Sequence, residues 1–138
     1  MLFQVQPPIC WPVPGWDWGL AGAGAIEDGV KYLETLNARL KMDANACSHI
    51  NCSYNSAIWL CNDVSIIEPP SLFVASFNTW FELQNPYLIY PASPYLASYA
   101  QDLLNYCSNF NEEPKMQKVG GQEFDTDNYN IIVRADSC

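Results

Sequence analysis

Four acidic residues, Glu123, Asp125, Asp127 and Asp136, lie near the end of this 138-residue chain, and paired carboxylates are the groups that cleave glycosidic bonds. Such cleavage requires two carboxyls that face each other across a groove. Glu123 and Asp125 are two residues apart and therefore share one face of an extended strand, whereas Asp127 falls in a turn. The pattern favours a hairpin tip in which Asp and Asn side chains hydrogen-bond to the turn, and it predicts no catalytic residue.

The same segment offers oxygen ligands in an order that is similar to the start of a calcium loop. Asp125, Asp127 and Asn128 would be the ligands. The glycine and the distal bidentate glutamate of an EF-hand are missing, so calcium is kept only as a minor alternative. We otherwise expect no metal and no cofactor.

The single histidine, His49, stands between Cys47 and Cys52. A structural zinc site needs four ligands, usually in two closely spaced pairs, and no second pair follows here. A histidine that activates a nucleophile must itself be oriented by a third group. The neighbouring cysteines are better candidates for disulfides, so zinc binding and nucleophilic catalysis are both disfavoured.

The cysteines predict a disulfide framework and hence an oxidising compartment. Six candidates are present: Cys10, Cys47, Cys52, Cys61, Cys107 and Cys138. We expect Cys61 to pair with Cys107, because one ends a predicted strand and the other ends a predicted helix. Cys10 lies in an N-terminal arm and is expected to be dispensable.

Secretion is the localisation that this framework predicts. The triplet Asn51-Cys52-Ser53 is a sequon for N-glycosylation, which agrees with that expectation, although pairing of Cys52 in the core would hinder access to Asn51. No leader peptide is visible in this chain, because its start lacks basic residues and prolines interrupt its apolar run.

The formal net charge of −9 excludes some partner classes. Nucleic acids and anionic membranes are bound through Lys and Arg, and the six basic residues of this chain are scattered. No segment is long and apolar enough for a membrane span. We expect a monomer that binds no nucleic acid and whose partner is cationic or neutral.

Two segments have helical periodicity. In residues 25–40, apolar side chains at Ile26, Val30, Leu33 and Leu40 fall near one face. In residues 94–107 one stripe is apolar, made by Leu96, Tyr99, Ala100, Leu103, Tyr106 and Cys107. We expect Ser93 to cap this second helix, since Pro94 suits its first turn.

Strands are predicted in two other regions. Residues 52–62 alternate in side-chain direction around an apolar centre, which is typical of a central strand. Residues 119–136 read as a hairpin, with a turn at 126–128 and a return strand over 129–135. The order helix–strand–helix–strand–strand predicts an α+β two-layer sandwich, in which two helices cover a small, mostly antiparallel, disulfide-stapled sheet.

The domain organisation that follows is an irregular N-terminal arm over 1–24 and one α+β domain over 25–138, which an irregular insert at 64–93 interrupts. This insert has four prolines and no cysteine, and neither the helical nor the strand period persists in it. Such long irregular connections are uncommon in compact domains. Three interpretations remain open: a functional or membrane-touching loop, partly buried irregular packing, or a retained intron.

The segments 52–63 and 119–138 resemble parts of small cysteine-rich secreted proteins of filamentous ascomycete fungi, which are distantly similar to killer-toxin-like and necrosis-inducing effector families with α/β-sandwich folds. The resemblance covers about residues 25–63 and 94–138 and includes no catalytic motif. It implies secretion and effector-like or toxin-like activity.

Two classes of function remain. The first is a secreted effector-like or toxin-like protein that acts by binding a host protein, a competitor protein or a glycan. The second is a secreted carbohydrate-binding protein or hydrolase that uses the acidic hairpin of Glu123, Asp125 and Asp127. Two facing carboxylates between aromatic walls would favour the second class, and a closed sandwich with dispersed acids would favour the first.

Overall fold

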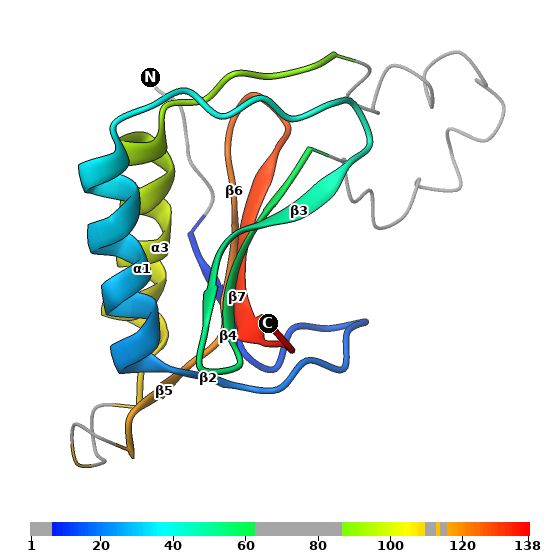
Figure 1. Cartoon of the computed structure of the whole chain (residues 1–138). Coiled ribbons are helices and arrows are strands. Elements are labelled where there is room, and N and C mark those ends of the chain that lie inside the picture. The colour runs from blue at the N-terminus through cyan, green and yellow to red at the C-terminus, as the bar shows by residue number, and fades with distance from the viewer. Residues whose placement is uncertain (1–6, 63–86, 110–112, 114–115) are drawn as a thin grey trace, which may run out of the picture.

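Two helices lie side by side across one face of an antiparallel sheet in the computed structural model, which describes residues 7–62, 87–109, 113 and 116–138 (Figure 1). Most of the expected insert, residues 64–86, lies outside the described residues. The helices are α1 (Ala23–Leu36) and α3 (Ser93–Cys107). The predicted α+β two-layer architecture is confirmed.

The main sheet has five strands in the order β1-β6-β7-β4-β3, with every neighbouring pair antiparallel. Its strands are β1 (Ile9–Cys10), β3 (Cys47–Ser53), β4 (Ser56–Cys61), β6 (Gly121–Phe124) and β7 (Asn130–Ala135). A small second sheet pairs β2 (Ala21–Gly22) with β5 (Lys118–Val119). Neither helix within the described ranges has the length and apolar character that a membrane crossing requires.

Helix α1 follows its predicted apolar face, because Ile26, Val30 and Leu33 are buried against the sheet. The helix ends earlier than the predicted residue 40. Asn37 adopts a left-handed conformation (φ 46°), which a short polar side chain tolerates at a helix end. The chain then runs extended and pairs with the segment before α3, so Leu40 packs on the core from outside a helix.

Helix α3 agrees with its prediction to within a residue, and Leu96, Ala100 and Leu103 are fully buried on the predicted stripe. The expected cap is wrong. Ala92 is the N-cap residue, and the Ser93 hydroxyl instead accepts a hydrogen bond from the backbone N–H of Ala38 at 3.0 Å. Ser93 therefore ties the chain after α1 to the start of α3.

The predicted strand over 52–62 is two strands joined by a tight turn. Tyr54 and Asn55 both have positive φ, 49° and 56°, which is the geometry of a type I′ hairpin. Strand β3, which precedes this turn, was not predicted because its polar residues and cysteines have little strand character. The predicted hairpin near the C-terminus is present as β6 and β7.

The N-terminal segment belongs to the folded core. β1 forms an edge of the main sheet, where Cys10 pairs with Gly121 in the ladder. A side chain at Gly121 would place Cβ 2.6 Å from the carbonyl oxygen of Ile9, so this close approach requires glycine. The segment expected as an irregular arm thus contributes β1 and β2.

All six cysteines are paired: Cys10–Cys107, Cys47–Cys61 and Cys52–Cys138. The expected Cys61–Cys107 bridge is wrong. Cys61 lies directly opposite Cys47 in the β3–β4 ladder, with 4.0 Å between their Cα atoms. Cys107, at the end of α3, lies beside the edge strand that carries Cys10, so Cys10 has a structural role that the sequence did not indicate.

Candidate functional site

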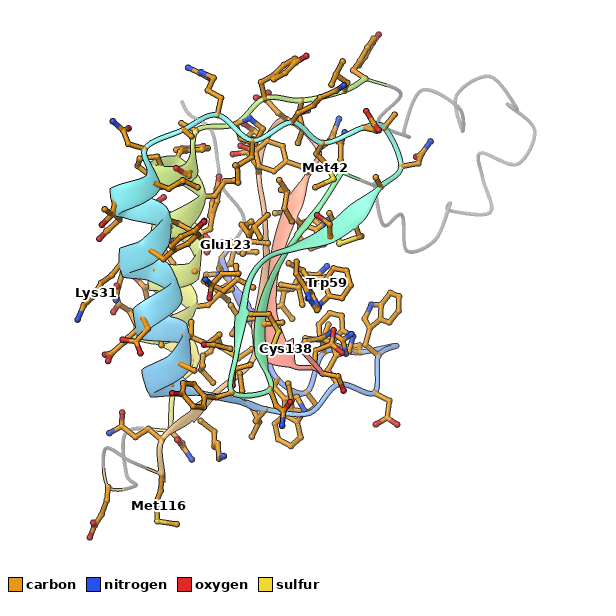
Figure 2. The ribbon with its side chains drawn as sticks, in the orientation of Figure 1. Lys31, Met42, Trp59, Met116, Glu123 and Cys138 are labelled. Atoms are coloured by element: carbon orange, nitrogen blue, oxygen red, sulfur yellow. A yellow bond between two sulfur atoms is a disulfide. The ribbon has the colours of Figure 1, made fainter. Side chains whose placement is uncertain are left out.

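The two faces of the main sheet differ in what covers them. Ile58, Leu60 and Ile131 point toward the helices and belong to the core. Trp59 alternates with the first two and therefore points to the opposite face. Figure 2 shows Trp59 on the side of the sheet away from the helices and Glu123 on the side that faces them. Each of these residues marks a candidate site.

On the face of the sheet that points away from the helices, five side chains form a continuous row: Trp16, Trp18, Arg134, Trp59 and His49. We call this set the aromatic row. The Trp16 and Trp18 rings stack with centroids 5.4 Å apart and an interplanar angle of 15°. The Arg134 guanidinium carbon lies 5.9 Å from the Trp18 centroid and 5.5 Å from the Trp59 centroid. The His49 ring meets Trp59 edge-on, with centroids 4.3 Å apart.

Asp136 fixes three members of the row through a single carboxylate oxygen. Its Oδ2 lies 2.9 Å from His49 Nε2, and it accepts hydrogen bonds from Trp59 Nε1 and from Arg134 Nη2, both at 3.1 Å. The hydrogen bond with His49 lowers the pKa of Asp136, and the Arg134 charge acts in the same direction. The Asp136 carboxylate and the Arg134 guanidinium form an ion pair, so these two charges of the aromatic row balance each other.

Short loops and strand pairing explain how the row forms. His49 and Trp59 are direct partners in the β3–β4 ladder, and β7 adjoins β4. Trp11 Nε1 donates a hydrogen bond to the Trp18 carbonyl at 2.7 Å and so anchors the loop that carries the remaining rings. Sequence patterns alone did not predict the aromatic row. The tryptophans of the N-terminal segment and the position of Trp59 on a strand were the available signals.

The acidic hairpin does not form a joint site. Asp125 is buried, and its Oδ1 accepts hydrogen bonds from the hydroxyls of Tyr95, at 2.7 Å, and Tyr99, while its Oδ2 accepts one from the backbone of Asp127. Asp125 raises the pKa of Tyr95 by accepting its hydrogen bond, and burial raises that of Tyr99. Asp125 thus stabilises the turn through its Oδ2 and joins the hairpin tip to α3 through its Oδ1.

The calcium alternative involved this same tip. Asp127 and Asn128 are exposed there, and Asp127 lines a cavity of about 410 Å³ with Arg39 and Tyr95. In the part of the chain that the structure describes, no group of three or more His, Cys, Asp or Glu side chains converges as metal ligands.

Glu123 points instead into a cavity of about 670 Å³ beside α3. Asp102 lies within hydrogen-bonding reach, and burial together with the nearby Asp102 charge raises the pKa of Glu123 to about 8. Tyr99 and Tyr106 also line this cavity. Asp102 was not identified from the sequence, although Tyr95, Tyr99, Asp102 and Tyr106 follow the i, i+4, i+7, i+11 spacing of one helical stripe.

Asn51, the glycosylation candidate, is half-buried in β3 with its side chain against α1. A Cβ atom at Gly29 would lie 2.5 Å from Asn51 Oδ1, so the carboxamide fills the space that this glycine leaves. Glycosylation of Asn51 stays a prediction, and it would require the side chain to turn away from the helix.

Comparison of this chain with protein-family models, with curated proteins and with solved structures found no match.

Proposed function

We propose that this protein is secreted and acts by binding, in the manner of an effector or toxin, and that it recognises a neutral glycan through the aromatic row. The three disulfides support an oxidising compartment outside the cytosol. Recovery of the protein from the medium of its source cells with all six thiols blocked would test secretion. Exclusively intracellular protein with free thiols would contradict it.

The aromatic row is the observation that carries the proposal. Trp16 is 55% exposed although it is one of the largest apolar side chains, and the two helices of the described residues, α1 and α3, both lie on the opposite face of the sheet. An exposed indole next to another stacked indole presents a flat π-surface on which the C–H face of a sugar ring can lie. Arg134, His49 and Asp136 place hydrogen-bonding groups beside these rings, and hydroxyl-rich ligands require such groups.

The ion pair within the aromatic row favours a glycan over an ionic partner at this surface. Arg134 and Asp136 neutralise each other within the row. A charged ligand would have to compete with that ion pair, whereas sugar hydroxyls can hydrogen-bond to its edges without breaking it. The surface is therefore suited to an uncharged, hydroxyl-rich molecule.

Hydrolysis by the acidic hairpin fits the geometry less well. Glycosidase carboxyls are separated by about 5–5.5 Å or by about 6.5–9.5 Å, according to mechanism. Glu123 and Asp102 are within hydrogen-bonding reach of each other, which leaves no room for a glycosidic bond between them. Asp125 is already occupied by two tyrosine hydroxyls. Binding without cleavage is thus the better interpretation.

Sedimentation with a panel of insoluble α-linked and β-linked polysaccharides tests the proposal, with tryptophan fluorescence as a second readout. We expect the protein to be retained by at least one polysaccharide and Trp16→Ala to lose most of that retention. Tyr54→Ala is the matched control, because Tyr54 is 87% exposed but lies in the β3–β4 turn. Retention by none of the polysaccharides, or equal retention of Trp16→Ala, would overturn the glycan assignment.

A further inference from the structure

A second cavity, on the helix side of the sheet, has a chemistry unlike that of the aromatic row. It has a volume of about 670 Å³. We call it the carboxyl–tyrosine pocket, after the five residues that give it its chemistry: Tyr95, Tyr99, Asp102, Tyr106 and Glu123. The remaining lining comes from Pro7, Pro8, Cys10 and Ser98.

Glu123 supplies an unsatisfied acceptor to this pocket. The residue is only 3% exposed, and within the described part of the chain no donor reaches its buried Oε1. Buried carboxyl oxygens are normally hydrogen-bonded, because desolvation without a partner costs free energy. Asp102 offers no relief to an ionised Glu123, since both groups would carry the same charge. A group that donates hydrogen bonds and carries positive charge would satisfy both carboxyls.

The tyrosines provide the remainder of a cation site. The hydroxyls of Tyr95 and Tyr99 donate hydrogen bonds to Asp125, so these two residues contribute mainly their rings to the pocket. Tyr106 is 71% exposed and lies toward solvent. Aromatic rings attract cations electrostatically, and their carbon surface also packs against an alkyl chain.

We propose that the carboxyl–tyrosine pocket binds a protonated alkylamine, whose ammonium group donates hydrogen bonds to Glu123 and Asp102 and whose carbon chain lies along Tyr106. The net charge of −9 attracts such a cation and repels anions. The amine can belong to a free molecule or to a lysine side chain of a partner protein. This site is separate from the aromatic row, because it lies on the opposite face of the sheet.

Binding of an amine at this site should release a proton to the solvent, whereas simple attraction of counterions to the acidic surface would release none. Before the amine arrives, the raised pKa of Glu123 keeps a proton on the carboxyl pair near neutral pH. The ammonium group replaces that proton, which leaves to the solvent. Among the described residues that line the pocket, the other titratable groups are Tyr95, Tyr99 and Tyr106 from α3, and Cys10 from β1 is held in a disulfide.

Isothermal titration calorimetry near pH 7 tests the proposal with two probes, 1,5-diaminopentane and a blocked peptide that contains one lysine. Salt at about 0.15 M suppresses non-specific attraction to the acidic surface. We expect saturable binding of at least one probe, and the stronger of the two identifies the source of the amine. Binding of neither probe would overturn the proposal.

Glu123→Gln should weaken this binding by at least about 10-fold, because a charged hydrogen-bond partner is lost. Glu34→Gln removes the same formal charge from the exposed surface of α1 and should leave affinity unchanged. Repeating the titration in two buffers of different ionisation enthalpy should show proton release by the native protein and none by Glu123→Gln. Equal affinity of the two variants, or binding without proton release by the native protein, would contradict the site.

Discussion

Glu123 lies on strand β6 next to α3, and the fold buries its carboxyl group away from water. Its side chain is almost fully buried, and burial together with Asp102 raises its pKa from 4.5 to about 8. The folded protein therefore holds a proton at pH values where the unfolded chain has released it. This difference links the stability of the whole protein to pH.

The sign of this linkage gives a prediction. Between about pH 4.5 and pH 8 the unfolded state binds fewer protons at this residue than the folded state, so the free energy of unfolding falls as the pH rises. The slope from one such group is at most about 1.4 kcal/mol per pH unit. Urea unfolding at several pH values should show a smaller decline for Glu123→Gln than for the native protein. The free energy of unfolding of Glu34→Gln should fall with rising pH as steeply as that of the native protein. An equally steep fall for Glu123→Gln would show that the pH dependence does not come from the buried Glu123 carboxyl.

Strand periodicity predicted that Glu123 and Asp125 share a face, and both side chains approach α3, but it could not predict that helix as their partner. The partners of Asp125 are tyrosines of α3, which precede it by 26 and 30 residues. Asp102 approaches Glu123 from the same helix. The site depends on how α3 is placed across β6, and no local pattern in the sequence encodes that placement.

At the scale of elements, α1 packs closely on the β3–β4 hairpin through Gly29. A Cβ atom at this position would lie 2.5 Å from Asn51 Oδ1 and 2.9 Å from Ile58 Cδ1. Ile58 is fully buried and has little freedom to move away. The glycine thus allows helix and hairpin to approach, although glycine is a poor helix former.

Gly29→Ala should accordingly reduce the free energy of unfolding by about 1–3 kcal/mol, because overpacking outweighs the gain in helix propensity. Gly24→Ala is the matched control, since nothing lies within 4 Å of its Cβ position in the same helix. Urea unfolding should show Gly24→Ala to be neutral or slightly stabilised. A stabilised Gly29→Ala variant would mean that helix and hairpin are not in close contact here.

Elements with one strong period were predicted best. Helix α3 was found almost to its ends because its apolar stripe is continuous over Ser93–Cys107. The prediction of one continuous strand over 52–62 was wrong at Tyr54. Its aromatic side chain is typical of strands, but it is 87% exposed and lies in a turn. The two-residue strands β1, β2 and β5 are defined by their pairing partners, and segments of that length carry no period.

At the scale of the whole molecule, two of the three disulfides connect segments that are distant in the sequence. Cys10–Cys107 joins the edge strand β1 to the end of α3 across 97 residues, and Cys52–Cys138 joins β3 to the C-terminus across 86. Cys47–Cys61 spans only 14 residues within one hairpin. The carboxyl–tyrosine pocket lies next to one of these bridges, since Cys10 is among its lining residues.

The cost of removing each bridge should follow the length of chain that it closes. Cross-linking restricts the unfolded chain by about 3 kcal/mol for a loop near 15 residues and by about 4.7 kcal/mol for one near 100. Paired Cys→Ala variants, unfolded in urea under oxidising conditions, should therefore show Cys47–Cys61 to be the least costly loss, with Cys10–Cys107 and Cys52–Cys138 costing similar, larger amounts. If the hairpin bridge proved the most costly to remove, its contribution would come from the folded β3–β4 ladder rather than from the unfolded chain.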